Sequence, residues 1–244
     1  TYTVFAPTNA AFTAAGIDVN SIPVDQLTNV LLYHVLGATV KSTDLQAGQT
    51  YASTASTGGP GGKQLSILVE KTGTAVKVNG TANVTSADLS ASNGVIHVVD
   101  KVLLPLDVVG HAAANSNFTS LVSTLGAASG DLVNVLSGTG PFTVFAPLNS
   151  AFAAISSVTA TLNADQLSKV LTYHVVSGNV VSSDLSNGMM VTTVNGEQFQ
   201  VNISGSSVTL TDAGGNVSNV VLTDVQATNG VIHVLDKVII PANL

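Results

Sequence analysis

The chain repeats itself over most of its 244 residues, and this repeat constrains the fold more than any other feature. Three phrases occur twice, in the same order. They are TVFAPTNAAF (3–12) and TVFAPLNSAF (143–152), DQLTNVLLYHVL (25–36) and DQLSKVLTYHVV (165–176), and GVIHVVDKVLLP (94–105) and GVIHVLDKVIIP (230–241). Their spacing is the size of a domain and far longer than a solenoid repeat. The sequence therefore predicts two tandem domains, residues 1–106 and 107–244.

Each copy reads as helices followed by strands. In the first copy, residues 2–7 are β-branched and aromatic and predict a strand, and residues 23–36 predict a helix. Short alternating runs follow, and Asn93-Gly94 predicts a tight turn before a long strand. This order favours an α+β architecture with a largely antiparallel sheet.

The two copies differ at their beginnings. Residues 117–130 and 131–138 carry helical patterns ahead of the second copy, and nothing corresponds to them before Thr3. We therefore expect the first domain to be incomplete at its N-terminus and to expose apolar core. We also expect the natural chain to be longer, with upstream residues cleaved or omitted.

Composition restricts the partners. Charged residues make up 9% of the chain, against about a quarter in ordinary proteins, and the net charge is −7. With only seven Lys and Arg in total, the chain lacks the basic cluster that phosphate binding requires, which argues against nucleic acid. It has no cysteine, which excludes disulfides and thiolate sites. No apolar run reaches the ~18 residues of a membrane span, so we expect membrane contact only through an anchor outside this chain.

Four histidines lie in the repeated phrases. His34 and His174 fall on an apolar helix face, and His97 and His233 alternate with Ile and Val in a strand. The favoured interpretation is a buried neutral imidazole paired with backbone or hydroxyl groups, because leaving it unpaired would cost ~1–3 kcal/mol. A catalytic base or a metal ligand is the alternative, but each domain has few histidines and no cysteine for a zinc site. We predict no metal and no cofactor.

Two other motifs suggest chemistry. Asp100 and Asp236 follow the strand histidines by three positions, which puts them on the opposite face of the strand, so a salt bridge or backbone hydrogen bond is favoured over a dyad. The stretch TGGPGGKQ (57–64) lacks the first glycine and the hydroxyl residue of a phosphate loop, which favours a surface loop.

In their order and spacing, the three repeated phrases resemble the fasciclin domain family. The resemblance covers nearly the whole chain and includes the pairs Tyr33-His34 and Tyr173-His174. It implies two wedge-shaped β-sandwiches flanked by short helices, in secreted or surface-anchored adhesion proteins without a catalytic role.

The resemblance also implies binding residues. Some family members are implicated in integrin binding through an Asp-Ile pair, and the matching positions here are Asp88-Leu89 and Asp224-Val225. The aspartate is present in both copies and the isoleucine in neither. Tyr33 and Tyr173 are further binding candidates by resemblance, whereas the neighbouring histidines are expected to hold the fold.

Three functions remain open at this stage. The first is an extracellular or cell-surface adhesion module that binds a surface or matrix protein, a polysaccharide or further copies of itself. The second is a secreted or periplasmic binder of a small apolar ligand or sugar. The third is a hydrolase using Asp or His, which a cleft with convergent polar groups would support.

Overall fold

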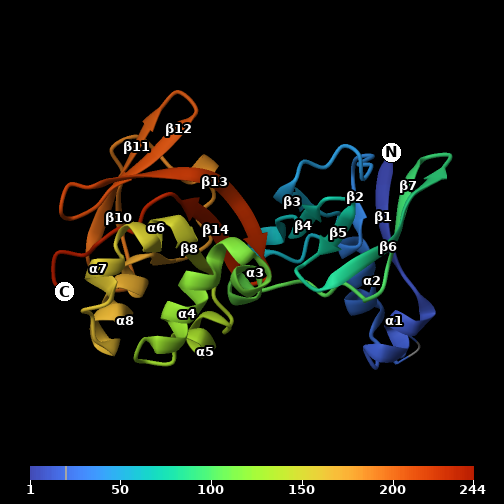
Figure 1. The fold of residues 1–244 in the computed structure, drawn as a ribbon, viewed down its shortest axis with the longest axis horizontal. Coiled ribbons are helices and arrows are strands. Elements are labelled where there is room, and N and C mark those ends of the chain that lie inside the picture. The colour runs from blue at the N-terminus through green and yellow to red at the C-terminus, as the bar shows by residue number, and fades with distance from the viewer. Residues whose placement is uncertain (20) are drawn as a thin grey trace. The chain divides into compact units, whose positions relative to one another are not determined.

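The computed structural model describes residues 1–19 and 21–244 and divides the chain into two compact units, Thr1–Leu106 and Asp107–Leu244 (Figure 1). We call them domain 1 and domain 2 and describe each by itself. The predicted α+β class is confirmed, since both contain one seven-stranded sheet and several helices.

Domain 1 begins with a strand, as its first phrase predicts. Its strands are β1 (Tyr2–Pro7), β2 (Val35–Leu36), β3 (Gly48–Ser53), β4 (Ser66–Thr72), β5 (Ala75–Val78), β6 (Ala82–Ala91) and β7 (Gly94–Val99). Its helices are α1 (Asn9–Ala14), α2 (Val24–Tyr33) and the 3-10 turn η1 (Pro60–Gly62). Thr8 caps α1 by accepting a hydrogen bond from the Ala11 amide, whereas α2 begins after Pro23 and has no side-chain cap.

Domain 2 repeats this order behind an additional helical segment. The helices are α3 (Val108–Ala114), α4 (Thr119–Ala127), α5 (Leu132–Leu136), α6 (Asn149–Ala154), α7 (Ser156–Thr159) and α8 (Ala164–Tyr173), with the 3-10 turns η2 (Ser116–Phe118) and η3 (Ser182–Asp184). The strands are β8 (Phe142–Pro147), β9 (Val175–Ser177), β10 (Met190–Thr192), β11 (Gln198–Ser204), β12 (Ser207–Thr211), β13 (Val217–Ala227) and β14 (Gly230–Leu235).

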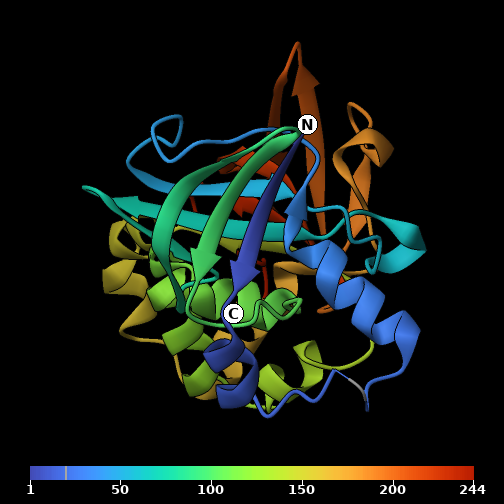
Figure 2. The same ribbon diagram turned by 90° about the vertical axis from the view of Figure 1, so that its right-hand side faces the viewer.

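Each sheet curls into a nearly closed barrel, which corrects the sandwich that the resemblance implied. The strand order is β2-β1-β7-β6-β5-β4-β3 in domain 1 and β10-β11-β12-β13-β14-β8-β9 in domain 2. In domain 1 the two edges meet, because Leu36 forms a bridge with Thr54 and the Ala55 amide donates to the Val35 carbonyl at 2.8 Å. Figure 2 shows the bent strands β1, β6 and β7 of this sheet. Edge closure requires one curved sheet rather than two stacked ones.

Each sheet contains one parallel pair of strands, formed by the first and the last strand of the copy. β1 pairs with β7, and Tyr2 lies opposite Gly94; β8 pairs with β14, and Phe142 lies opposite Gly230. A Cβ atom on either glycine would lie 2.0 Å from the carbonyl oxygen of the residue opposite. Both copies therefore need glycine at this position, which explains why the Asn-Gly turn is repeated.

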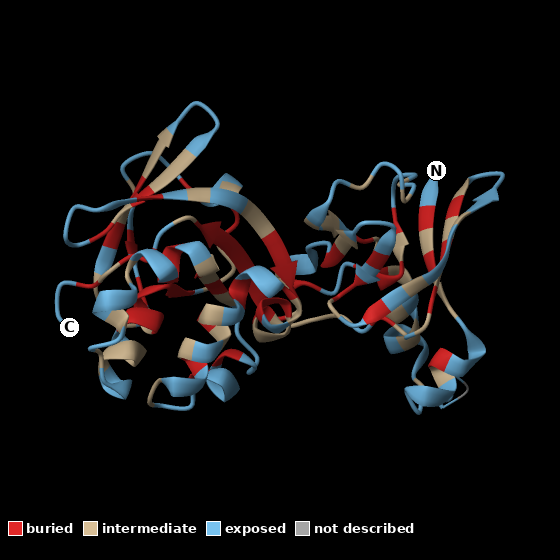
Figure 3. Ribbon diagram, viewed as in Figure 1, coloured by how far each residue is buried: buried red, intermediate tan, exposed pale blue. Residues whose placement is uncertain are grey.

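The outer face of this parallel pair is covered by a helix in domain 2 and is open in domain 1. Every residue of β14 is buried, and α3 packs on β14 and β8. In β7 only every second residue is buried, as Figure 3 shows for the right-hand sheet. The helices differ likewise: Leu171 in α8 is 3% exposed, whereas Leu31 at the matching position in α2 is 48% exposed. In the described part of domain 1, no helices correspond to α3, α4 and α5.

Because Leu171 is buried and Leu31 is exposed, the same substitution is expected to destabilise domain 2 more than domain 1. Leu171→Ser is expected to lower the free energy of unfolding of domain 2 by about 2–5 kcal/mol, because it removes a buried side chain and inserts a hydroxyl. Leu31→Ser is expected to change that of domain 1 by about 1 kcal/mol or less. Urea denaturation followed by hydrogen exchange in each domain compares them, and equal losses would contradict the assigned exposure of α2.

Candidate functional site

Both domains contain a β-bulge at the aspartate of the proposed binding pair. The register of β6 on β7 shifts between Ser86 and Leu89, and Asp88 adopts a left-handed backbone with φ of 61°. β13 shifts against β14 between Leu222 and Val225, and Asp224 has φ of 62°. Aspartate tolerates this conformation better than β-branched residues do, and bulges redirect side chains. The bulge turns each aspartate away from the ladder.

In domain 1 the Asp88 carboxylate holds the loop that follows β2, residues 37–47, which we call the strap loop. Asp88 accepts hydrogen bonds from the Ser42 amide at 2.8 Å and from the Ser42 hydroxyl at 2.5 Å. These bonds lower the pKa of Asp88, with the serine hydroxyl as the main cause. The aspartate is therefore held ionised by the loop that it fastens.

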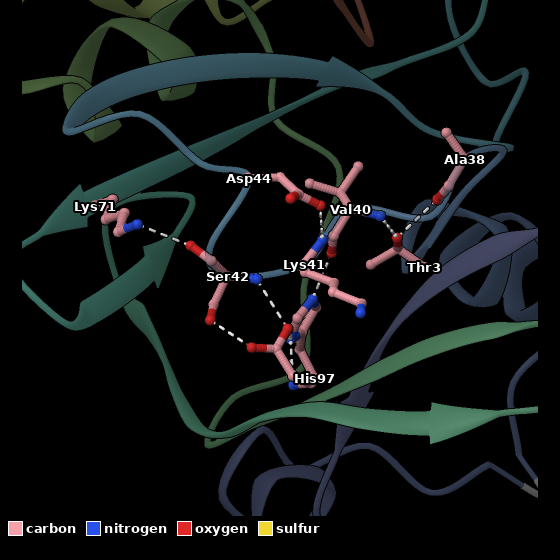
Figure 4. Close-up of polar contacts among 9 residues, drawn as sticks. Thr3, Ala38, Val40, Lys41, Ser42, Asp44, Lys71 and His97 are labelled. Carbon is pink, nitrogen blue, oxygen red and sulfur yellow. Dashed lines mark hydrogen bonds and ion pairs between the residues drawn. The ribbon is translucent and has the colours of Figure 1, made fainter.

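His97 fastens the same loop from the neighbouring strand. Its Nδ1 accepts from the Asp88 amide at 3.2 Å, and its Nε2 contacts the Val40 carbonyl at 2.9 Å. A carbonyl only accepts hydrogen bonds, so the neutral ring carries its proton on Nε2. Figure 4 shows these contacts, together with Thr3, whose hydroxyl donates to Ala38 and accepts from the Val40 amide. We call Thr3, Ser42, Asp88 and His97 the strap network.

Domain 2 repeats this network residue by residue. Asp224 accepts from the Ser182 amide at 2.7 Å and from the Ser182 hydroxyl. His233 Nδ1 accepts from the Asp224 amide at 3.4 Å, and its Nε2 lies 2.9 Å from the Val180 carbonyl. The Thr143 hydroxyl donates to Gly178 and accepts from the Val180 amide, as Thr3 does in domain 1.

The strap network contains serine, histidine and aspartate, but its connections differ from those of a catalytic triad. A triad needs the serine hydroxyl to donate to the histidine, which in turn is oriented by the carboxylate. Here the Ser42 hydroxyl donates to Asp88, and Nδ1 of His97 is occupied by a backbone amide. The closest approach of His97 to the Asp88 carboxylate is 4.0 Å. The ring has no free nitrogen in this arrangement to accept the serine proton.

The helix histidines also bond to the backbone with both nitrogens. Nδ1 of His34 lies 2.7 Å from the Val30 carbonyl, and its Nε2 accepts from the Leu103 amide at 2.9 Å. In domain 2, Nδ1 of His174 lies 2.8 Å from the Val170 carbonyl, and its Nε2 accepts from Ile239 at 3.1 Å. Burial lowers the pKa of His34 and lowers that of His174 to about 4. Each ring ties the end of a helix to the segment after the last strand.

The tyrosines beside these histidines are fully buried. The Tyr33 hydroxyl donates to the Ser66 carbonyl and accepts from the Asn79 amide group, each at 2.9 Å. The Tyr173 hydroxyl donates to Gln198 at 2.8 Å and accepts from the Ala213 amide at 3.1 Å. Burial raises both pKa values, that of Tyr173 to about 12. A partner could touch either ring only if the barrel opened.

Asp100 and Asp236 tie the end of the last strand to the strand before it. Asp100 accepts from the Asn83 amide at 2.7 Å and from the Asn83 side chain at 2.8 Å, and the side-chain bond is the main cause of its lowered pKa. Asp236 makes the same two bonds to Asn219, at 2.7 and 2.5 Å. Burial would raise the pKa of Asp236, but these hydrogen bonds outweigh it and the pKa is lowered.

The two proposed binding pairs differ in accessibility. In domain 1 the Asp88 side chain is 32% exposed and Leu89 is 45% exposed. In domain 2 Val225 is only 2% exposed; it pairs with Ile232, which lies on the sheet beneath α3 and α4. Only the domain 1 pair therefore presents both a carboxylate and an apolar side chain to solvent.

The described residues contain neither a cluster of metal ligands nor a membrane-spanning helix. Across residues 1–19 and 21–244, no three His, Asp or Glu side chains gather as a metal ion would need. Among the helices described, none is both long enough and apolar enough to cross a bilayer.

Sequence reasoning missed Ser42, Ser182 and the two threonines of the strap network. A signal for them exists, since VKSTDL (40–45) returns as VVSSDL (180–185) at the same spacing as the first two repeated phrases. The sequence around Ser42 does not indicate that it bonds Asp88, because the contact depends on a bulge more than 40 residues away.

Comparisons with known proteins agree with this architecture. The fasciclin domain profile matches residues 1–105 and 116–241. Protein sll1483 of Synechocystis is 42% identical over 141 residues, covering 56% of this chain and 74% of that protein. Human periostin is 26% identical over 250 residues, which cover 98% of this chain but only 28% of periostin.

A solved structure supports the fold independently. The domain pair of the insect cell adhesion molecule Fasciclin I matches with a TM-score of 0.59 and 20% identity, covering 97% of this chain and 87% of that one. The profile matches to both copies show that the chain belongs to the fasciclin domain family.

Proposed function

We propose that this chain is a non-catalytic adhesion or matrix-binding module, secreted or held at a cell surface. The observation that carries the proposal is the exposed pair Asp88-Leu89, which lies at the β-bulge of β6, the middle strand of a weakly charged domain. An apolar side chain that becomes buried in an interface contributes binding free energy, and a carboxylate beside it can accept hydrogen bonds from the partner. Membership in a family that includes an insect cell adhesion molecule supports this reading.

The partner class follows from the surface chemistry. Few charged side chains and many Ser, Thr and Asn residues favour a protein or polysaccharide surface that is bound by apolar contact and neutral hydrogen bonds. Two domains in one chain add avidity when both engage the same surface. The His, Ser and Asp residues of the strap networks are occupied by internal hydrogen bonds, which favours binding over hydrolysis.

Binding of the whole chain to isolated cell-surface material and to immobilised collagen, fibronectin and cellulose tests the proposal. Leu89→Asp is expected to weaken binding at least ~10-fold, since it removes the exposed apolar contact. Val24→Asp, at a 76% exposed position on α2, is the control and should bind like the unmodified chain. Failure to bind any of these surfaces, or equal binding by both variants, would count against the proposal.

A further inference from the structure

Domain 1 contains a pocket inside one end of its barrel, beneath the strap loop. Its volume is about 220 Å³. Its lining includes the apolar side chains of Leu45, Ala52, Val69 and Val76 and the polar side chains of Asp44 and Thr50. Val40, Ser42, Asp44 and His97 are seen together in Figure 4. The lining is mostly apolar, and both nitrogens of His97 are already hydrogen-bonded.

The repeat allows the same place to be found in domain 2. Tyr33 donates to the carbonyl of Ser66, and Tyr173 donates to that of Gln198, so β4 and β11 are aligned by these two residues. One position further, Ile67 therefore corresponds to Phe199.

The strand facing β4 carries smaller residues in domain 1 than in domain 2. Ala52 lies opposite Ile67, and Val191 lies opposite Phe199, so Ala52 corresponds to Val191. Two residues earlier, Thr50 lies opposite Val69, and Met189, just before β10, accepts from the Val201 amide, so Thr50 corresponds to Met189.

The smaller residues of domain 1 at these positions account for the volume of the pocket. Val191 is 6% exposed and belongs to the core of domain 2, and Met189 packs against that core. In domain 1 an alanine and a threonine stand at these positions, and neither reaches as far into the barrel. A well-packed protein leaves few voids larger than a water molecule, and this pocket lies in the copy with the smaller residues.

The mouth of the pocket is polar. Asp44 Oδ2 accepts from the Lys41 amide at 2.9 Å, and Gln46 and Thr50 are exposed beside it. The Lys71 ammonium bonds the Ser42 and Leu45 carbonyls of the same loop, at 2.8 and 2.9 Å. Lysines on this loop and against it offset the carboxylate, which favours a neutral hydrogen-bonding group over an ammonium ion.

We propose that the domain 1 pocket binds a small neutral molecule with an apolar body inside the barrel and a hydroxyl group at the mouth, near Asp44 and Thr50. An apolar cavity of about 150 Å³ holds a benzene-sized molecule, so this pocket fits roughly a ring with a short side chain. Apolar pockets with a few polar groups at one end are the usual form of such sites. This site does not depend on the adhesive function proposed above.

Titration of the whole chain, with labelled Leu and Val methyl groups, by 2-phenylethanol tests this site by NMR. We expect saturable shifts at Leu45, Val69 and Val76, with a Kd of about 1 mM or lower. Ethylbenzene, which lacks the hydroxyl, is expected to bind at least ~3-fold more weakly.

The double variant Thr50→Met/Ala52→Val gives domain 1 the residues of domain 2. It is expected to fold at least as stably as the unmodified chain and to bind 2-phenylethanol at least ~10-fold more weakly. Ser53→Val, on the same strand but facing out of the barrel, is the control and should bind normally. Shifts that do not saturate, or unchanged binding in the filled variant, would overturn the site, and equal binding of ethylbenzene would overturn the assigned hydroxyl contact.

Discussion

Replacing His174 by alanine is expected to lower the free energy of unfolding of domain 2 by about 2–4 kcal/mol. The imidazole joins the Val170 carbonyl near the end of α8 to the Ile239 amide after the last strand. Alanine would leave a buried amide without its acceptor, at ~1–3 kcal/mol, and would add a cavity of nearly a whole ring.

Hydrogen exchange resolved by peptide, combined with urea denaturation, measures this loss in domain 2 separately from domain 1. Lys169→Ala is the matched control, because it removes an exposed side chain from the same helix and should change stability by less than about 0.5 kcal/mol. A His174→Ala variant as stable as the control would show that the ring does not hold α8 in place.

Acidification from pH 7 to pH 4 is expected to cost domain 2 about 6 kcal/mol of stability. His111 and His174 are both buried, and burial lowers the pKa of each from 6.5 to about 4. The folded-state pKa lies below the unfolded one, so the unfolded chain takes up protons first as the pH falls. Stability is therefore complete above about pH 7 and is lost progressively down to about pH 4, at about 3 kcal/mol for each histidine.

Other groups act in the same direction. Burial lowers the pKa of His233 in domain 2 and of His34 in domain 1, which adds to the loss in the same range of pH. The pKa values of Asp88, Asp100 and Asp236 are lowered from 3.8. Their contribution to the free energy of unfolding is therefore fully present above about pH 3.8 and is lost only as the pH falls below that value.

Urea denaturation of the chain at pH 7, 5.5 and 4 measures this dependence. The His174→Ala variant serves as the internal comparison, since it should lose about 3 kcal/mol less than the unmodified chain over the same range. A domain 2 whose stability is constant between pH 7 and 4 would contradict the buried, neutral state of these rings.

The repeated phrases predicted the α+β class and the family because each phrase carries a local pattern. The Asn-Gly turn, the alternating strand and the amphipathic helix are all readable within about a dozen residues. The apolar stripe in α8 likewise follows from spacing: Val170 and Leu171 are buried, as their positions beside His174 predict.

Features that depend on distant partners could not be read in this way. Closure of the barrel rests on a bridge between Leu36 and Thr54 across a loop of no clear pattern. Leu89 is exposed and Val225 is buried, although they occupy matching positions in the two copies. The difference arises because helices cover the sheet of domain 2 and not that of domain 1. The pocket lies beside Thr50 and Ala52. That these residues are smaller than Met189 and Val191 becomes apparent only when strand register aligns the two copies.

Within each domain, the two repeated histidines stabilise the fold through fixed hydrogen bonds to backbone groups. Nitrogen-15 NMR of the imidazole rings at pH 8 tests it most directly, because it reports which nitrogen carries the proton. The hydrogen bonds predict a proton on Nε2 in His97 and His233 and on Nδ1 in His34 and His174. Rings that exchange between both tautomers, or that show the reverse assignment, would contradict it.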